Sequence, residues 1–501
     1  MACCSNLPIK VIFLLFIAQM TQAMVLSSMF AYLPQLLHRF KIPWNEVGYY
    51  QGIIVAEFSV VFILANLLTA GAFKYFSTKN IFILASAIQG LAFLFVSFSV
   101  NFTWLVVGVF LLATPSILQS AIEVVVYEVT DDSNQTESAN YAISAPWNVG
   151  MVLGPAIGGS LAFPVEEYSK LFAKNIFLKK FDIFLPNVVL ACMQFSVTLA
   201  AFCIIPRKSK KRDLIDKSHR ASNDENESIE CKRIDTNSSN ETEKAKDING
   251  IVTDINIKNS SHEPSERDTG FGQNANSKNT VSWLDLMKDK NAILISIIVL
   301  LFCAVTDGFQ TGFSLYSQTP EDIGGLEYTP AKLGSILLVA GIIIVICDML
   351  FIGKSIVFLG LKRSILLFNA MMIFGIGAIV SVNIFTTEVA FVLYALNIAF
   401  VRVCVSGMRV SMTAIIMSVI PGHLMGVFFS ARNCFGAIGG GLGPIITGSL
   451  FAWSLKNEKS ANDDAIGFPF NHVFAFFFLA ILTLACLICA SMLPDNIKRE
   501  E

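Results

Sequence analysis

The chain has 501 residues, of which 54% are hydrophobic and only 15% are charged, and its formal net charge at pH 7 is −2. Soluble globular domains carry about 25% charged residues, so this composition excludes an ordinary soluble protein. The small net charge gives no electrostatic reason to expect a nucleic-acid partner, and we expect none. Long apolar runs separated by short polar breaks instead predict a multi-pass membrane protein whose main surroundings are the lipid bilayer.

The apolar runs predict an all-α membrane protein with twelve transmembrane helices, six on each side of a long polar segment. The first run is too long for the apolar region of a signal peptide. No small-residue cleavage site follows it, so we expect it to remain as helix 1. The predicted spans are residues 9–33, 47–70, 80–100, 103–127, 141–163, 185–205, 291–314, 332–352, 364–383, 388–417, 426–453 and 468–493.

This layout predicts two six-helix bundles, residues 1–205 and 283–494, and a short tail at residues 495–501. Between the bundles, residues 206–282 are rich in Lys, Asn, Ser, Asp and Glu and contain few large apolar side chains. Such a segment cannot bury enough surface to offset its ordering entropy. We therefore expect a disordered central loop.

Basic residues at the membrane border predict the orientation. The cluster RKSKKR at residues 207–212 follows helix 6 directly, and loop 8–9 also carries Lys and Arg. Because cytoplasmic loops are enriched in these residues, we expect both termini and residues 206–282 to be cytoplasmic. Of the six Asn-x-Ser/Thr sequons, only the one at Asn101 then faces outward. We expect little N-glycosylation, and none at the other five.

Two glycine–proline windows repeat half a chain apart. Residues 154–161 read GPAIGGSL and residues 443–450 read GPIITGSL, in predicted helices 5 and 11. Proline removes a backbone donor and glycine lets a neighbouring backbone approach, so we expect both helices to pack closely on the opposite half. The alternative is that the small residues serve helix packing alone, with no part in a movement between the halves. The residues concerned are Gly150, Gly154, Pro155, Gly158, Gly159, Gly439, Gly443, Pro444 and Gly448.

The pattern Gly-x-x-x-Gly-Pro-x-x-Gly-Gly at residues 150–159 resembles the helix-5 motif of the drug:proton antiporter branch of the major facilitator superfamily. Longer stretches resemble its subgroup of zinc-induced-facilitator and tetracycline-resistance-like proteins, across nearly the whole chain. They include residues 127–159, 283–291, 313–341 and 439–455. The resemblance implies two pseudo-symmetric six-helix bundles that carry a small-molecule substrate by alternating access, as a monomer and without a cofactor or metal.

One departure concerns the family signature of loop 2–3, Gly-x-Leu-x-Asp-Arg-x-Gly-Arg. Here residues 71–80 read GAFKYFSTKN, which keeps Gly71 but places Tyr75 at the Asp position and Phe76 at the Arg position. The charge interaction that the family uses in its outward-facing state is therefore missing. Loop 8–9 keeps more of the signature, with Asp348, Gly353 and Arg363.

Ionisable side chains inside a span cost about 2.5 to 3.5 kcal/mol on insertion scales, so each is a candidate functional residue. Three of these residues, at positions 123, 348 and 409, lie near the predicted cytoplasmic ends of their helices. The alternative for them is that the side chain is hydrated and has no functional role. The set is Glu57 in helix 2, Glu123 in helix 4, Asp307 in helix 7, Asp348 in helix 8, and Arg402 and Arg409 in helix 10.

In the resembled fold, helices 1, 4, 7 and 10 line the central cavity. Each of them carries polar groups at helical spacing here, whereas helices 3, 9 and 12 have no charged residue in mid-span. The alternative is hydrogen bonding between helices, worth about 0.6 kcal/mol per bond. The candidates for a substrate and proton pathway therefore also include Gln19, Gln22, Gln119, Gln310 and Ser406.

These residues suggest a mechanism in which substrate binds near the midplane between the halves. Arg402 would hold an anionic group of the substrate or the carboxylate of Glu57 or Glu123. Glu57 would bind and release a proton during the cycle, since buried acids serve as proton relays. A permanent structural role for Glu57 is the alternative.

The leading prediction is a secondary active transporter of a small organic solute, coupled to protons, in a vacuolar, lysosomal or plasma membrane. One alternative is a uniporter or a lipid-handling relative. An alternative of another class is a transport-dead receptor or scaffold that signals through residues 206–282. An enzyme is excluded, because the sequence has no nucleotide-binding loop, no His cluster and no nucleophile motif.

Overall fold

A computed structural model describes residues 9–129, 133–172, 174–205, 290–379, 387–419, 425–459 and 470–494. Every regular element in these ranges is helical, which confirms the predicted all-α class. The predicted disordered loop, residues 206–282, and the predicted tail, residues 495–501, lie outside the described residues.

The N-terminal half contains six long helical segments and several short helices. The fourth segment is interrupted by the 3-10 turn η1, where Pro115 departs from helical geometry. The elements are α1 (Ile9–Phe30), α2 (Leu33–Arg39), α3 (Trp44–Tyr75), α4 (Thr78–Ser97), α5 (Phe102–Ala113), η1 (Thr114–Ser116), α6 (Ile117–Val129), α7 (Ser133–Leu161), α8 (Pro164–Glu167), α9 (Ser169–Phe172), α10 (Ile176–Lys180) and α11 (Phe184–Ile204).

The C-terminal half repeats the arrangement. Its second segment passes through a π-helical turn, η3, before it continues as a short helix. The elements are α14 (Lys290–Gln318), η2 (Glu321–Ile323), α15 (Pro330–Cys347), η3 (Asp348–Ile352), α16 (Gly353–Leu359), α17 (Leu361–Ala378), α18 (Thr387–Val419), α19 (Met425–Lys459) and α20 (Phe474–Ser491).

The predicted spans coincide with these helices to within a few residues. Among the described residues, 11 segments are long and apolar enough to cross a membrane. The one predicted span that is not among these 11 segments, residues 141–163, corresponds to α7, which packs lengthwise against α1 and α15. The signature predicted as loop 2–3 is largely helical, because α3 continues through Gly71 to Tyr75 and α4 begins at Thr78.

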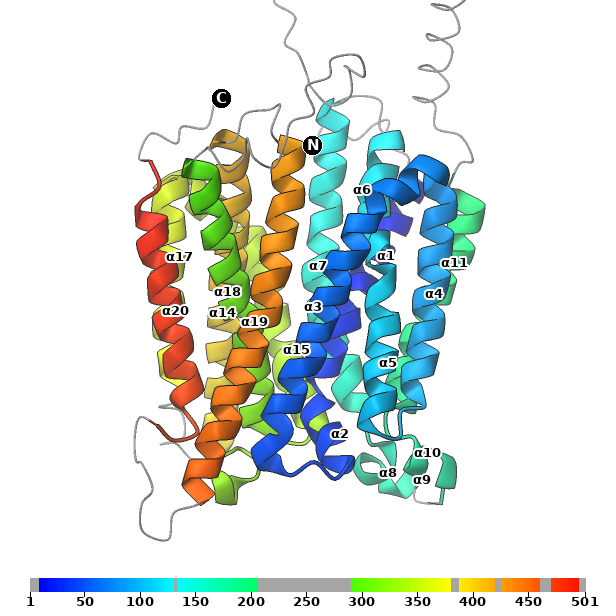
Figure 1. Ribbon diagram of the computed structural model, residues 1–501, viewed down its shortest axis with the longest axis vertical. Coiled ribbons are helices and arrows are strands. Elements are labelled where there is room, and N and C mark those ends of the chain that lie inside the picture. The colour runs from blue at the N-terminus through cyan, green and yellow to red at the C-terminus, as the bar shows by residue number, and fades with distance from the viewer. Residues whose placement is uncertain are drawn as a thin grey trace, which may run out of the picture. The chain divides into compact units, whose positions relative to one another are not determined.

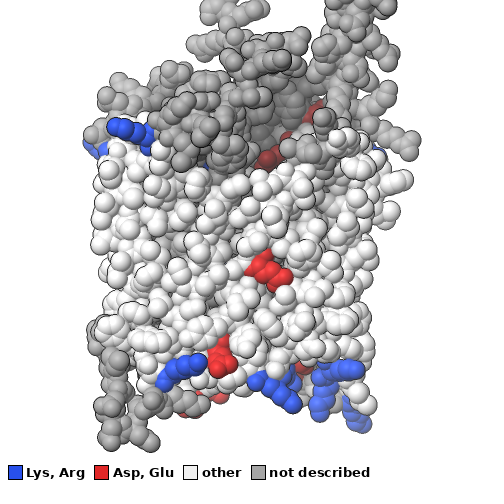
Figure 2. Space-filling model, in the orientation of Figure 1, with Lys and Arg blue, Asp and Glu red and all other residues white. Residues whose placement is uncertain are grey.

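The helices run between two ends of the bundle. Figure 1 shows that α1 begins and α20 ends at one of them, the termini end, while α2, α8, α9 and α10 lie at the other, the α2 end. In Figure 2 the charged side chains gather near the two ends and leave a wide uncharged band between them. Such a band is what a hydrocarbon layer about 30 Å thick requires of the surface that it touches.

The two halves meet along two seams. The α7–α15 seam joins helices 5 and 8, and the α3–α19 seam joins helices 2 and 11. Within each half, α7 also packs along α1, and α19 packs along α14. The repeated windows therefore occupy equivalent helices, each of which contacts both its own half and the opposite one.

Candidate functional site

A cluster of charged side chains lies between α14 and α18 in the C-terminal half. Asp307 interacts electrostatically with Arg402 and Arg409. Arg402, Ser406 and Arg409 are spaced by four and three residues, which places them on one face of α18 as predicted. Asp307 and Arg402 are half-buried, and Arg409 is exposed.

Room for the central carboxylate comes from a glycine on α19. A Cβ atom added to Gly440 would lie 2.6 Å from Asp307 Oδ2, so a larger residue there would displace the carboxylate. The triple glycine of α19 thus lets a carboxylate lie against the helix. Sequence reasoning missed Gly440, although its place in the run GGGLGP next to the repeated window was a usable signal.

Asp348 belongs to this cluster rather than to loop 8–9. It is the first residue of the π-helical turn η3. Its Oδ2 accepts a hydrogen bond of 2.6 Å from the Asn148 amide on α7, so the contact crosses the α7–α15 seam. The Ser406 hydroxyl and the Arg409 guanidinium interact with the same carboxylate. This position agrees with the prediction that Asp348 lies in helix 8, just before loop 8–9, and its part in the loop signature stays a prediction.

A second group of polar side chains lies nearer the termini end. Glu123 on α6 interacts with Gln119 of its own helix and electrostatically with Arg432 on α19. Glu123 is exposed and Gln119 is half-buried. Arg432 was missed in the sequence, although it is an ionisable residue inside the predicted span 426–453.

Glu57 lies apart from both groups. It is half-buried on α3, and its Oε2 has no hydrogen-bond partner among the described residues. Ala56 and Ser59, its neighbours in sequence, contact Gly441 of α19. The predicted pairing of Arg402 with Glu57 or Glu123 is replaced by its interaction with Asp307.

The remaining predicted pathway residues have separate environments. The Gln22 amide donates to Gln89 Oε1 on α4 at 2.5 Å, so it is tied within its own half. Gln19 and Gln310 are buried, and Gln19 Oε1 has no partner in the described ranges. Gln89 was missed, because helix 3 carries no charged residue in mid-span.

A small cavity opens where α7, α15 and α18 meet. Its volume of about 40 Å³ is room for roughly three water molecules. The cavity joins the charged cluster to the seam between the halves. Its polar lining includes Trp147, Asn148, Arg402, Ser406 and Arg409.

Both helices pack on the opposite half as predicted, but most glycines of the repeated windows contact their own half. A Cβ added to Gly150 would collide with the Met20 carbonyl of α1, and one added to Gly158 would collide with the Ser28 carbonyl. In the other half, a Cβ on Gly439 would collide with α14. The same holds for Gly154 against α1 and for Gly443 against α14.

The last glycine of each window does contact the opposite half. A Cβ on Gly159 would collide with the Pro330 carbonyl of α15, and one on Gly448 would collide with the Gly48 carbonyl of α3. Each window therefore packs on two helices at once, one from each half. Pro155 and Pro444 lie between these two sets of contacts, inside their helices.

The other loop-signature residues do not join the charged cluster. Gly71 lies within α3, and Arg363 is exposed at the start of α17. Gly353 begins α16, where an added Cβ would meet no other heavy atom within 4 Å. At the start of α4, the Thr78 hydroxyl donates to Glu128 of α6 at 2.8 Å. The Thr78 hydroxyl, within the altered signature at residues 71–80, therefore makes a polar contact with α6.

At the α2 end, hydrogen bonds join the two halves. The Gln318 amide on α14 donates to the Ala31 carbonyl at 3.1 Å, and its oxygen accepts from the Gln35 backbone N–H at 3.3 Å. The Ser314 hydroxyl donates to the Phe30 carbonyl. All three contacts involve the turn between α1 and α2, so this end is closed in the observed conformation.

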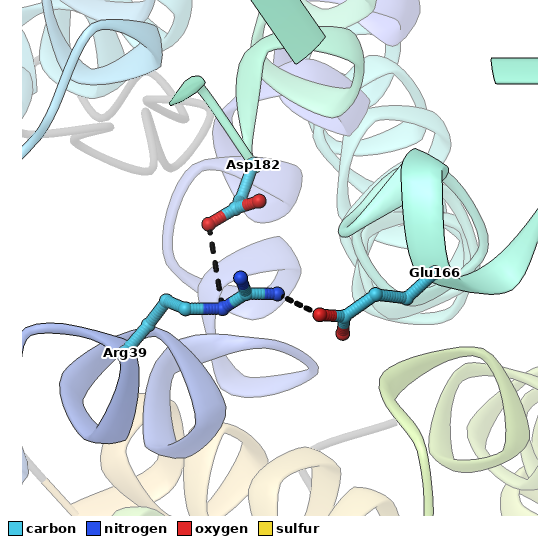
Figure 3. Close-up of polar contacts among 3 residues, drawn as sticks. All are labelled: Arg39, Glu166 and Asp182. Atoms are coloured by element: carbon cyan, nitrogen blue, oxygen red, sulfur yellow. Dashed lines mark hydrogen bonds and ion pairs between the residues drawn. The ribbon is translucent and has the colours of Figure 1, made fainter. Parts of the chain in front are cut away.

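A charged triad stands beside this turn. Arg39, the last residue of α2, forms ion pairs with Glu166 on α8 and with Asp182, whose Oδ2 lies 3.6 Å from Arg39 Nε (Figure 3). Burial raises the pKa of the Asp182 carboxyl to about 6; Arg39 opposes this shift and Glu166 adds to it. The described residues between α7 and α11, 162–172 and 174–183, thus form a structured connection.

Comparison with known proteins places these features in a family. Residues 11–444 match the sequence model of the Major Facilitator Superfamily. Protein ZINC INDUCED FACILITATOR-LIKE 1 of Arabidopsis thaliana is 23% identical over 467 residues, which cover 91% of this chain and 86% of that protein. The Major facilitator superfamily multidrug transporter mfsB of Aspergillus fumigatus is 22% identical over 219 residues, or 42% of this chain and 36% of that protein.

Solved structures show the same fold. A bacterial homologue of the human lysosomal transporter Spinster, in an inward-facing and occupied conformation, gives a TM-score of 0.60 at 11% identity and covers 96% of both chains. A D-xylose-proton symporter gives a TM-score of 0.60 at 12% identity, over 98% of this chain and 99% of that one.

Proposed function

The chain belongs to the Major Facilitator Superfamily, whose members are transporters and not enzymes, and on this premise we propose a proton-coupled secondary active transporter of a small organic solute. Membrane transport of small solutes follows from the family and the fold. Proton coupling, the charged cluster as its site and the orientation are parts of the proposal.

The observation that carries the proposal is the charged cluster at the centre of the helices. Charged side chains within a membrane are costly and persist where they serve ion or substrate movement. Here two carboxylates, Asp307 and Asp348, lie among Arg402 and Arg409 beside a water-sized cavity. Interhelical packing alone would be satisfied by neutral hydrogen-bonding residues at lower cost.

In this mechanism Asp307 takes the role that sequence reasoning assigned to Glu57. While Asp307 is ionised, it neutralises Arg402 and Arg409. A proton on Asp307 removes that neutralisation and frees a guanidinium for an anionic group of the substrate. Proton binding and substrate binding then affect each other, which is what coupling requires.

The two seams would carry the conformational change. Gly159 and Gly448 allow backbone-to-backbone contact between the halves, so each seam is smooth enough to slide or separate. The hydrogen bonds of Gln318 close the α2 end in the observed state. The exposed Arg409 and Glu123 lie on the side toward the termini end, which supports access from that side.

The orientation follows from the basic residues described above: we place the termini end in the cytosol. The transporter would work as a monomer in the plasma membrane or in a vacuolar or lysosomal membrane. It would export its solute from the cytosol or load it into an acidic compartment.

Proton flux in proteoliposomes tests this proposal. Purified protein is compared with Asp307→Asn and Glu57→Gln while small organic anions, cations and zwitterions are supplied. Substrate-dependent proton movement should fall at least tenfold in Asp307→Asn and stay near the wild-type rate in Glu57→Gln. Loss in Glu57→Gln alone would return the proton role to Glu57.

Two other outcomes identify the alternative functions. Substrate flux without proton movement would show a uniporter or a lipid-handling relative, and the charged cluster would then serve substrate binding only. No flux of any solute from correctly folded protein would favour the receptor or scaffold that signals through residues 206–282.

A further inference from the structure

A basic segment with exposed apolar side chains lies at the α2 end of the N-terminal half. It comprises α9, α10 and the described residues next to them, 169–172 and 174–181, and we call it the α9–α10 segment. Figure 1 shows it at the edge of the bundle, and Figure 2 shows basic side chains gathered at the same place. None of its residues belongs to the charged cluster described above.

The α9–α10 segment is fixed to the rest of its half. The Asn175 side chain caps α10 by accepting from the Leu178 backbone N–H at 3.2 Å, and Leu178 itself is buried. The Phe177 ring lies 4.8 Å from that of Phe184, the first residue of α11, and 6.5 Å from that of Phe98, which follows α4. The segment therefore presents its outer side chains in a fixed arrangement.

Two large apolar side chains of this segment remain uncovered. Leu171 is 77% exposed and Ile176 is 83% exposed. The aromatic side chains of Phe98, Trp104 and Phe177 are exposed beside them at the same end of the bundle. Exposed aromatic rings at the end of a helix bundle are typical of the border between lipid and water. The apolar side chains therefore lie where they can enter a lipid layer.

Four lysines accompany these apolar side chains, and all four are exposed: Lys170, Lys174, Lys179 and Lys180. No ion pair within the described ranges involves any of them. Glu166 and Asp182 are paired with Arg39 instead, and Glu167 is the one other acid in residues 164–183. The segment and its surroundings thus keep an excess of positive charge.

Membrane topology does not explain this charge. In the proposed orientation the segment is not cytosolic, and lysines are enriched on the cytosolic side. Lysines beside exposed apolar side chains are instead the composition of an element that lies in the membrane interface. Each lysine near an anionic membrane surface strengthens binding roughly fivefold.

We propose that the α9–α10 segment binds anionic phospholipids of the leaflet at the α2 end. Leu171 and Ile176 enter the border of the acyl chains, and the four lysine ammonium groups contact the phosphates of the headgroups. The occupant is a lipid and not a soluble anion, because a soluble anion would leave both apolar side chains in water. Only the identity of the leaflet, the non-cytosolic one, rests on the proposed orientation.

Hydrogen–deuterium exchange of the purified full-length protein in lipid nanodiscs tests this site. Exchange at residues 174–181 should be at least threefold slower in discs with one-third phosphatidylserine than in discs of phosphatidylcholine alone. The double variant Lys179→Gln/Lys180→Gln should lose most of this protection. Lys332→Gln/Lys456→Gln removes the same charge at the α2 end of the other half and should keep it. Equal exchange of the wild-type protein in both discs would overturn the proposal.

The apolar contribution is tested separately. Ile176→Ser should reduce the protection at least twofold, because the side chain no longer favours the acyl border. Phe358→Ser is the matched control, since Phe358 is 89% exposed on α16, away from the α2 end. Protection that is unchanged in Ile176→Ser would contradict insertion of the segment into the lipid layer.

A soluble partner is the competing occupant. Inorganic phosphate or an acidic peptide, polyglutamate, is added to protein in discs of phosphatidylcholine alone, and neither should slow exchange at residues 174–181. Protection by either probe equal to that in anionic discs would overturn the lipid proposal and assign the surface to a soluble anion. Because no transported solute is needed, these results are independent of the proposed transport function.

Discussion

At the residue scale, the exposed α2 end holds a group that titrates near pH 6. Burial raises the pKa of Asp182 to about 6 from an ordinary value near 3.8. Arg39 and Glu166 are the charged groups that act on it.

This pKa predicts the direction of a pH effect on stability. A carboxyl whose pKa is higher in the folded state holds its proton in the fold where the unfolded chain has lost it, so stability falls as pH rises from about 4 to 6. The shift corresponds to at most about 3 kcal/mol. Thermal unfolding in detergent across this range should show the fall, and Asp182→Asn should remove it. A slope that persists in Asp182→Asn would assign it to another group.

The same cluster predicts a pH-dependent phenotype for its arginine. Above pH 6 Asp182 is mainly ionised, so replacing Arg39 with Gln leaves a partly buried carboxylate without its cation. At lower pH Asp182 is protonated and neutral, so the loss of the cation costs less. Arg39→Gln should therefore lower the melting temperature more at pH 7.5 than at pH 5. Lys79→Gln is the control at the other end of the bundle. Equal destabilisation by Arg39→Gln at both pH values would contradict the electrostatic account.

At the element scale, the glycine windows separate packing within a half from packing between halves. Gly158 contacts α1 of its own half, whereas Gly159, the next residue, contacts α15 of the opposite half. Adjacent positions on one helix thus have different consequences, because successive side chains point about 100° apart. The sequence repeat alone could not show this difference.

Two neighbouring substitutions should therefore behave differently. Gly158→Leu should mainly prevent folding, since overpacking costs typically 1 to 3 kcal/mol and the obstructing group is a backbone carbonyl. Gly159→Ala should fold but slow transport, since it separates the halves at one point. Size-exclusion profiles report folding, and solute flux reports transport. Well-folded but inactive Gly158→Leu protein would instead support a sliding role for Gly158.

At the scale of the whole molecule, the observed conformation is held at the α2 end by Gln318. Its amide makes two hydrogen bonds across the halves and is only 4% exposed. Each such bond contributes about 0.5 to 1.5 kcal/mol net. The contribution of Gln318 to the closed α2 end is therefore small, as suits a transporter that alternates between two states.

Gln318→Leu should shift the molecule toward a state that is open at the α2 end. Loss of about 1 to 2 kcal/mol changes the equilibrium roughly five- to thirtyfold. Deuterium exchange in the last turns of α14 and the first turns of α3 should rise accordingly. Ser317→Ala, whose hydroxyl bonds only the Ser314 carbonyl of its own helix in the described structure, is the matched control. No difference between the two variants would exclude Gln318 from gating.

The sequence by itself determined the fold class, the positions of the helices and the repeat that relates the two halves. Apolar runs must span the bilayer wherever they occur, and glycine–proline windows need close packing whichever helix provides it, so these features are readable residue by residue. The clustering of Arg402, Ser406 and Arg409 on one face also followed from helical spacing alone.

Only the tertiary structure decided which groups meet. Glu57 and Asp307 look alike in sequence, since each is a lone acid in an apolar run, yet only Asp307 lies among the arginines. The same holds for Asp348, which meets Asn148 of the opposite half, and for Gly158 and Gly159, which contact different halves. The direction in which a side chain points on a buried helix is set by packing against other helices. A helix that is apolar on all faces has no amphipathic pattern from which that direction could be predicted.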